Sequence, residues 1–302
     1  MIANMGAILA GGIAAGIFAT NSPEACEYIT KHSLAEIVVV DGNKQLCKYK
    51  NVHKSMPHIK AIVCWGEPVN EAIATECGVK VYTFDEFMGL GKDVSDDALE
   101  TRVAGSKPGN CCTLIYTSGT TGAPKACMIS HDNITWTVKS YLENYLVMDH
   151  TERGISYLPL SHIAAQMMDI HCSVFLGCSV YFAQTDALKG SLVHTMRDVK
   201  PTFIFGVPRV WEKFQEKMVQ KGRELGLVSQ TISSWAKSVG TEKTRCGQFE
   251  CEDTPNVVTD YIASLILSNV KSALGLEDCR GCFTGAAPIS MDTLNYFGSL
   301  DI

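Results

Sequence analysis

A run of small hydroxyl-bearing and glycine residues lies between an apolar segment, residues 114–116, and a lysine. Its glycines let the backbone turn tightly and bring N–H groups close to an anion. Its hydroxyls add donors, and the lysine adds a positive charge. We therefore predict a polyphosphate-binding segment, called here the phosphate loop, at residues 117–125. Its residues are Thr117, Ser118, Gly119, Thr120, Thr121, Gly122, Ala123, Pro124 and Lys125.

The phosphate loop does not match the Walker A pattern of nucleotide triphosphatases. That pattern needs two glycines five positions apart, followed by Lys-Ser/Thr and a helix. Here Gly119 and Gly122 are three apart, Pro124 precedes Lys125, and residues 126–129 (ACMI) favour a strand. Walker A chemistry is thus excluded, and the remaining alternative is a surface loop without function.

Short apolar runs alternate with amphipathic stretches along the whole chain. The predicted strands are residues 37–40, 59–65, 79–84, 112–116, 155–158, 174–182 with a break at Gly177, 202–205 and 282–284. The predicted helices are residues 23–33, 133–145, 208–225 and 260–274. Alternating strands and helices predict an α/β fold with layered, mostly parallel sheets.

Two segments are harder to assign. Residues 1–20 carry no Asp, Glu, Lys or Arg, and this length could span a bilayer. They are rich in Gly and Ala and lack the basic flank of a signal or anchor, so we predict a buried helix packed closely on a sheet. Residues 229–256 are polar, which predicts a helix end followed by an exposed loop.

Composition further limits the class of protein to which this chain can belong. The 302 residues are 46% hydrophobic and 19% charged, typical of a globular protein with one large or two small domains. The net charge of −6 argues against nucleic acid as the main partner. Thirteen cysteines without a secretory signal predict free thiols in a reducing compartment. Cys246, Cys251, Cys279 and Cys282 could form a zinc site, but burial of Cys279 and Cys282 as small hydrophobes is favoured.

The phosphate loop and its preceding strand resemble the signature of the adenylate-forming, or AMP-binding, superfamily: Tyr-Thr-Ser-Gly-Thr-Thr-Gly-x-Pro-Lys, here residues 116–125. Residues 157–162 (YLPLSH) and 284–289 (TGAAPI) resemble two further motifs in the same order. Residues 206–212 (GVPRVWE) are similar to the long-chain fatty acid–CoA ligase branch, and residues 11–25 to its bubblegum-type subgroup. The likeness runs along nearly the whole chain.

This resemblance implies the acetyl-CoA synthetase-like fold and a two-step ligase reaction. A fatty acid attacks the α-phosphate of Mg²⁺-bound ATP to give an acyl-adenylate, and coenzyme A then displaces AMP. It implies that the phosphate loop holds the β- and γ-phosphates, with Lys125 catalytic, and that His162 orients or gates the acyl and adenylate groups. It assigns no metal ligand in this chain. The residues implied to line the adenine pocket and acyl tunnel are Gly285, Ala286, Ala287 and Pro288.

The sequence also departs from the family pattern. Ala126 follows the lysine where the family usually has Gly, a change that we expect to be tolerated. The family's later Tyr-Gly-x-Thr/Ser-Glu motif, its ribose-binding Asp and its small C-terminal domain with a catalytic Lys have no counterpart. The resemblance therefore implies that residues 1–302 are a partial AMP-binding large domain without the small domain, with little ligase activity alone.

Three functions stay open at this point. The first is a long-chain fatty acid–CoA ligase whose partners are a fatty acid, ATP and coenzyme A. The second is an inactive nucleotide-binding or interaction fragment, and the third is an enzyme that adenylates another carboxylate. Because long-chain acyl-CoA synthetases tend to act at membrane surfaces, the resemblance implies a cytoplasmic protein with peripheral attachment, for example at the endoplasmic reticulum.

Overall fold

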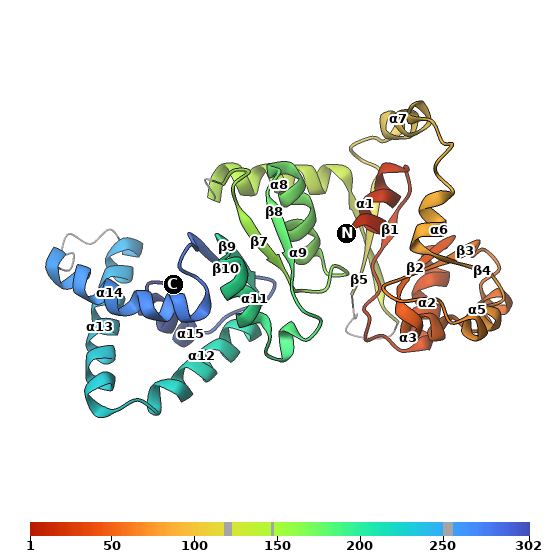
Figure 1. The fold of residues 1–302 in the computed structure, drawn as a ribbon. Coiled ribbons are helices and arrows are strands. Elements are labelled where there is room, and N and C mark those ends of the chain that lie inside the picture. The colour runs from red at the N-terminus through yellow and green to blue at the C-terminus, as the bar shows by residue number, and fades with distance from the viewer. Residues whose placement is uncertain (118–122, 146–147, 250–255) are drawn as a thin grey trace. The chain divides into compact units, whose positions relative to one another are not determined.

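The computed structural model describes residues 1–117, 123–145, 148–249 and 256–302 (Figure 1). The chain divides into two compact units. The first comprises Met1–Asn144 and Pro159–Met167, and the second comprises Tyr145–Leu158 and Met168–Ile302. Each unit holds its own sheets and its own buried core.

The first unit contains two three-stranded sheets. In one, the order is β2-β3-β4 and all strands are parallel; in the other, β1 lies parallel and β6 antiparallel to the central β5. The strands are β1 Ala14–Ala15, β2 Ile37–Asp41, β3 Ala61–Trp65, β4 Lys80–Thr83, β5 Cys111–Thr117 and β6 Lys125–Ser130. The β2-β3-β4 sheet packs on a cluster of buried residues that includes Val40, Leu46 and Ile62.

Helices surround these sheets. The helices are α1 Ile2–Leu9, α2 Pro23–Ser33, α3 Gly42–Leu46, η1 Cys47–Tyr49, α4 Val52–Ser55, α5 Glu71–Cys77, α6 Phe84–Gly89, α7 Asp96–Gly105, α8 His131–Tyr145 and α9 Ile163–Ala165. Helix α2 begins where its sequence predicts: Ser22 Oγ accepts the Ala25 N–H, and Pro23 occupies the first turn. It ends at Leu34, which adopts a left-handed conformation.

The second unit contains two pairs of parallel strands. They are β7 Arg153–Ser156 with β8 Ser179–Phe182, and β9 Phe203–Gly206 with β10 Gly281–Thr284. The helices are η2 Gln166–Cys172 (a π-helix that begins in the first unit), α10 Ser173–Leu176, η3 Ala187–Lys189, α11 Leu192–Val199, α12 Pro208–Arg223, α13 Leu227–Phe249, α14 Val257–Leu274 and α15 Met291–Gly298. Trp211 anchors the core, with its ring edge-on to Phe297 at 5.1 Å.

The structure confirms the α/β fold with mostly parallel sheets, and it corrects three segments. Residues 174–182 are not one interrupted strand, because 173–176 form α10 and only 179–182 pair with β7. Residues 1–20 form a short, largely exposed helix α1 followed by β1, instead of a buried helix. Residues 227–249 form the 23-residue helix α13, where the polar composition predicted a helix end and a loop.

In the part of the chain that the structure describes, no helix combines the length and the apolar character needed to cross a membrane. Helix α14 illustrates the point: it has 18 residues but carries Asp260 and Lys271.

A buried carboxyl in the second unit makes a pH dependence of stability predictable. Burial raises the pKa of Asp169 from 3.8 to about 7, although a hydrogen bond with Ser156 partly opposes the shift. Between pH 4 and 7 the folded state therefore holds a proton on Asp169 that the unfolded chain has lost, so the contribution of Asp169 to stability falls as pH rises through this window. Asp169→Asn should abolish this fall, in urea unfolding at pH 5 and pH 8. The exposed Asp198→Asn is the control and should keep it.

Candidate functional site

The two ends of the phosphate loop are paired where it connects the strands of a β-hairpin. Thr117 closes β5, Lys125 opens β6, and their Cα atoms are register partners. Both side chains are exposed, and no described carboxylate lies within ion-pair distance of the Lys125 ammonium. Ala123 and Pro124 lie just before this lysine. The hairpin thus presents a hydroxyl and a free cation on neighbouring strands, a pair that suits an anion.

The Ala126 departure can be placed against this hairpin, whereas residues 118–122 of the loop cannot. The predicted ligands Ser118, Gly119, Thr120, Thr121 and Gly122 lie outside the described residues. Ala126 lies in β6 opposite Tyr116, and its φ is not positive. The backbone conformation therefore does not require glycine at this position.

His162 begins the short helix α9. Its ring Nδ1 accepts the Ala164 N–H at 3.2 Å, and the backbone N–H of His162 donates to the Pro159 carbonyl at 3.0 Å. Because Nδ1 acts as an acceptor, the proton of the neutral imidazole belongs on Nε2. The ring can therefore donate a hydrogen bond from Nε2, as a group that orients an oxyanion or a carboxylate would do.

Gln166 connects the His162 segment to the strand that leads into the phosphate loop. It is fully buried, and its Nε2 donates to the Leu160 carbonyl at 2.8 Å. Its Oε1 lies 3.4 Å from Thr113 Oγ1 in β5. On the other side, a Cβ on Gly16 would approach the Ser161 Cα to 2.8 Å, so only glycine permits this packing. Sequence reasoning did not assign a role to Gln166, because a lone Gln after a helix start carries no local signal.

Gln166→Leu should therefore lower the free energy of unfolding of the first unit. The substitution leaves the Leu160 carbonyl and the Thr113 hydroxyl with one partner fewer in a buried place, which costs about 1–3 kcal/mol. Urea unfolding followed by tryptophan fluorescence measures the change. The exposed Gln220→Leu on α12 is the control, and an equal effect of the two variants would contradict the assignment.

The predicted adenine segment belongs to the second unit, after β10. Thr284 ends the strand, and Gly285–Pro288 follow as a surface turn. Ala286 has φ 71°, a left-handed conformation that disfavours a residue with a Cβ. Such strained positions are concentrated at functional sites.

Two side chains fix the carboxyl ends of the neighbouring strands of this unit. The Trp211 indole N–H lies 3.1 Å from the Gly206 carbonyl and 3.2 Å from the Phe283 carbonyl, which bridges β9 and β10. The Tyr157 hydroxyl donates to the Phe205 carbonyl at 2.8 Å. In open α/β sheets, ligands bind in the crevice outside the carboxyl ends of the strands. The motif residues of this unit therefore lie where the fold type places a ligand.

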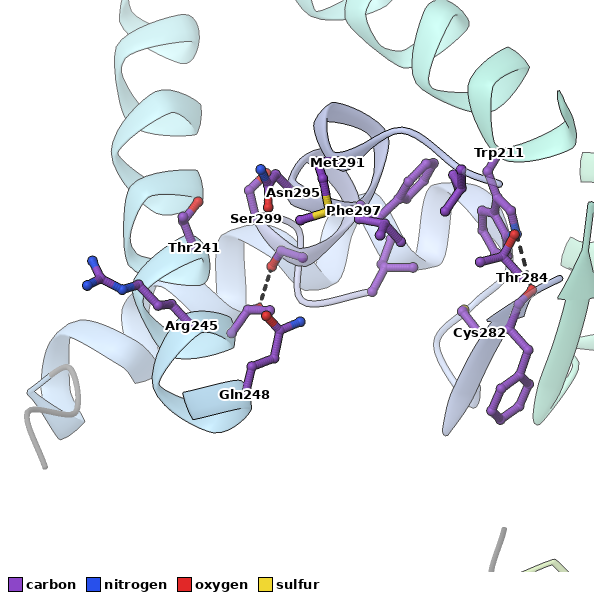
Figure 2. Close-up of a pocket in the computed structure, with 16 residues that line it drawn as sticks. Trp211, Thr241, Arg245, Gln248, Cys282, Thr284, Met291, Asn295, Phe297 and Ser299 are labelled. Atoms are coloured by element: carbon purple, nitrogen blue, oxygen red, sulfur yellow. Dashed lines mark hydrogen bonds between the residues drawn. The ribbon is translucent and has the colours of Figure 1, made fainter. Parts of the chain in front are cut away.

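A pocket of about 450 Å³ lies between the end of β10 and helices α13 and α15 (Figure 2). Trp211, Met291 and Phe297 contribute an apolar wall, and Thr241 and Arg245 of α13 contribute a polar side. Beside it, Thr284 Oγ1 is buried and has no hydrogen-bond partner among the residues that the structure describes. Gly285–Pro288 do not line this pocket, although Thr284 before them and Ile289 after them do.

No group of three or more His, Cys, Asp or Glu among the described residues could hold a metal ion. The four-cysteine zinc alternative is not tested, because Cys251 lies outside the described residues. Of the other three, Cys279 and Cys282 have sulfurs 3.6 Å apart and Cys246 is buried on α13. A hydrogen bond from the Cys282 thiol lowers the pKa of Cys279, and the same contact raises the pKa of Cys282. Among the described residues, Cys279 and Cys282 are thiols in hydrogen-bond contact and not a disulfide.

The chain is similar to long-chain fatty acid–CoA ligases along its whole length. It is 48% identical to the long-chain-fatty-acid–CoA ligase ACSBG2 of Xenopus laevis, covering 100% of this chain and 40% of that protein. It is 42% identical to human ACSBG1, with 99% of this chain and 41% of that protein covered. The chain thus spans about two fifths of the length of these relatives.

Solved structures show the same fold. The A domain of the carboxylic acid reductase from Segniliparus rugosus, in complex with AMP and a carboxylic acid, matches with a TM-score of 0.65 at 17% identity, over 98% of this chain and 44% of that one. The anthranilate CoA ligase AuaEII, in complex with anthranoyl-AMP, matches with a TM-score of 0.56 at 22% identity, over 69% of this chain and 38% of that one. The family model described as "AMP-binding enzyme" matches residues 1–299. The chain belongs to the AMP-binding enzyme family.

Proposed function

We propose that this chain carries the triphosphate-binding and acyl-orienting part of a long-chain fatty acid–CoA ligase. The observation that supports this most is the hairpin that closes the phosphate loop and presents Lys125 exposed, without an ion pair to a described residue. The identity of 42–48% to bubblegum-type ligases supports the choice of a long-chain fatty acid as substrate.

In this proposal, Thr117 and Lys125 hold the β- and γ-phosphates of ATP. The fatty acid carboxylate then attacks the α-phosphorus, the bond to the bridging oxygen breaks, and pyrophosphate leaves with the electron pair. Lys125 neutralises charge on the leaving group, since phosphoryl-type chemistry depends mainly on positioning and charge neutralisation. His162 donates from Nε2 to an oxygen of the carboxylate or of the adenylate.

Coenzyme A completes the reaction, because its thiolate attacks the acyl carbon and releases AMP. ATP-dependent ligation of this type also uses Mg²⁺. The described residues offer no ligand cluster for the ion, so in this proposal it is carried by the phosphates of ATP. We also propose that the protein acts in the cytoplasm at a membrane surface, where its fatty acid substrate would be available.

The test is ATP–pyrophosphate exchange driven by palmitate, together with palmitoyl-CoA formation, in the full-length protein. Both activities are expected. ATP binding without either activity would favour an inactive nucleotide-binding protein. Exchange driven by a short-chain or aromatic acid but not by palmitate would assign a different carboxylate, and either result would overturn the proposal.

A further inference from the structure

Helix α2 contacts both ends of the phosphate loop through side chains that the ligase chemistry does not otherwise use. The Tyr28 hydroxyl donates to the carbonyl of Pro124, the residue before Lys125, at 3.0 Å. His32 Nδ1 shares a hydrogen bond of 2.9 Å with the hydroxyl of Tyr116, the residue before Thr117. One helical turn thus binds the chain where it enters the loop and where it leaves it.

These contacts form one connected cluster of three rings. Tyr28 and His32 stack at 5.6 Å between ring centroids, and the His32 ring lies edge-on to Tyr116 at 5.8 Å. The Tyr116 side chain is 6% exposed, and its hydroxyl also lies 3.4 Å from the Ile29 carbonyl of α2. Helix α2 is itself fixed by its Ser22 cap and by buried residues on its inner face. The cluster therefore fixes Tyr116 and Pro124, which lie at the two ends of the loop, relative to helix α2.

Packing alone does not account for the Tyr28 contact. Its hydroxyl reaches a backbone carbonyl 96 positions along the chain, at the last residue before the lysine. A phenylalanine would fill the same space without that bond. The bond sets where β6 starts and hence where Lys125 stands relative to Thr117.

We propose that Tyr28 and His32 are positioning residues that hold the two described ends of the phosphate loop, Thr117 and Lys125, ready for the β- and γ-phosphates of ATP. This inference rests on the proposed function, because it takes the loop to bind phosphate. A loop held in its binding conformation loses less entropy when the ligand arrives. Loss of the hydrogen bonds from Tyr28 and His32 should therefore weaken the binding of ligands that carry a diphosphate or triphosphate. The binding of ligands without these groups should be unchanged.

The experiment compares Tyr28→Phe and His32→Phe with the wild-type chain. Tyr82→Phe is the matched control, because it removes a hydroxyl that makes no hydrogen bond in the described structure. Calorimetry measures the affinity for ATP, for pyrophosphate and for AMP. Hydrogen–deuterium exchange follows the peptide that covers residues 117–125 without ligand. Circular dichroism confirms that each variant is folded.

We expect Tyr28→Phe to lower the affinity for ATP and pyrophosphate about fivefold to tenfold, the size of one hydrogen bond. AMP affinity should stay unchanged, and exchange at 117–125 should be faster. Tyr82→Phe should match the wild type throughout. A general loss of stability would lower all three affinities alike, which would overturn the positioning role.

Different results would contradict the positioning role of Tyr28 and His32 and the phosphate-binding function of the loop. If wild-type protein binds ATP and pyrophosphate but Tyr28→Phe binds and exchanges identically, the positioning role is wrong and the phosphate loop stands. If wild-type protein binds neither ligand, the phosphate-binding function of the loop is wrong. In that case the inference is wrong as well, whatever the exchange of residues 117–125 shows about the hydrogen bonds from Tyr28 and His32.

Discussion

Replacement of Lys125 by alanine should slow acyl-adenylate formation by about 10²–10³-fold, the usual effect of removing one group that stabilises charge in a transition state. Lys125 is the first residue of β6, exposed, and opposite Thr117. Its charge is worth most as pyrophosphate departs, because negative charge then accumulates on the leaving group. The measurement is palmitate-dependent ATP–pyrophosphate exchange in the full-length protein.

The same variant should leave fatty acid binding nearly unchanged, since the acyl chain does not contact the phosphate loop in the proposed arrangement. Lys107→Ala is the matched control: this lysine is exposed in the same unit, before β5. Its hydrogen bonds to described residues involve the backbone, with its N–H donating to Asn110 Oδ1 and its carbonyl accepting the Asn110 N–H. Unchanged exchange in Lys125→Ala, or an equal loss in Lys107→Ala, would show that the loop does not serve the reaction as proposed.

Arg280→Ala should destabilise the second unit by about 3 kcal/mol, because it leaves a buried carboxylate without its cation. Glu152 is 1% exposed, forms an ion pair with Arg280, and also accepts a hydrogen bond from Thr202. This network joins the segments that precede β7, β9 and β10. Urea unfolding of the second unit, followed by its tryptophan fluorescence, gives the free energy.

Two further variants distinguish the Glu152–Arg280 ion pair from ion pairs on the protein surface. Arg209→Ala removes an exposed arginine that pairs with Glu212 and Glu216, and it should barely change the unfolding midpoint. The double variant Glu152→Leu, Arg280→Leu should recover much of the stability that Arg280→Ala loses, because no isolated charge remains buried. A double variant less stable than Arg280→Ala would show that the ion pair itself, and not the orphaned carboxylate, is decisive.

The features of this protein that were predictable from sequence are local. Residues 61–65 form a strand that is buried on both faces over its first four positions, as the apolar run predicts. Residues 37–41 also form a strand, but buried and exposed positions alternate along it. Helix α2 follows from Ser22 and Pro23. The hairpin around the phosphate loop follows from an apolar run before Thr117 and a strand-forming run after Lys125.

The wrong predictions have physical reasons. Helix α13 is polar overall, but Ala236 and Val239 are buried on one face, and this sparse stripe is sufficient once α14 packs against it. In residues 1–20, small residues that suggested close helix packing instead end α1 early, with a left-handed glycine at Gly11.

The residues that hold the site together were not predictable, since their partners are distant in sequence. Gln166 meets Thr113 and Leu160, and Tyr28 meets Pro124, only after the chain has folded. The fold and the motifs can be read from residue types, whereas these contacts depend on tertiary packing. The roles of Lys125, His162 and Gly285–Pro288 stay predictions.

Ala286 shows that an exposed position can still restrict which residue types it accepts, because its backbone is left-handed. Its side chain is exposed, so a survey of contacts would class the position as freely variable. The backbone imposes a different rule, because at φ 71° glycine and asparagine fit readily while valine and isoleucine clash with their own main chain. The residue types that this position accepts without strain are therefore limited by its own backbone conformation.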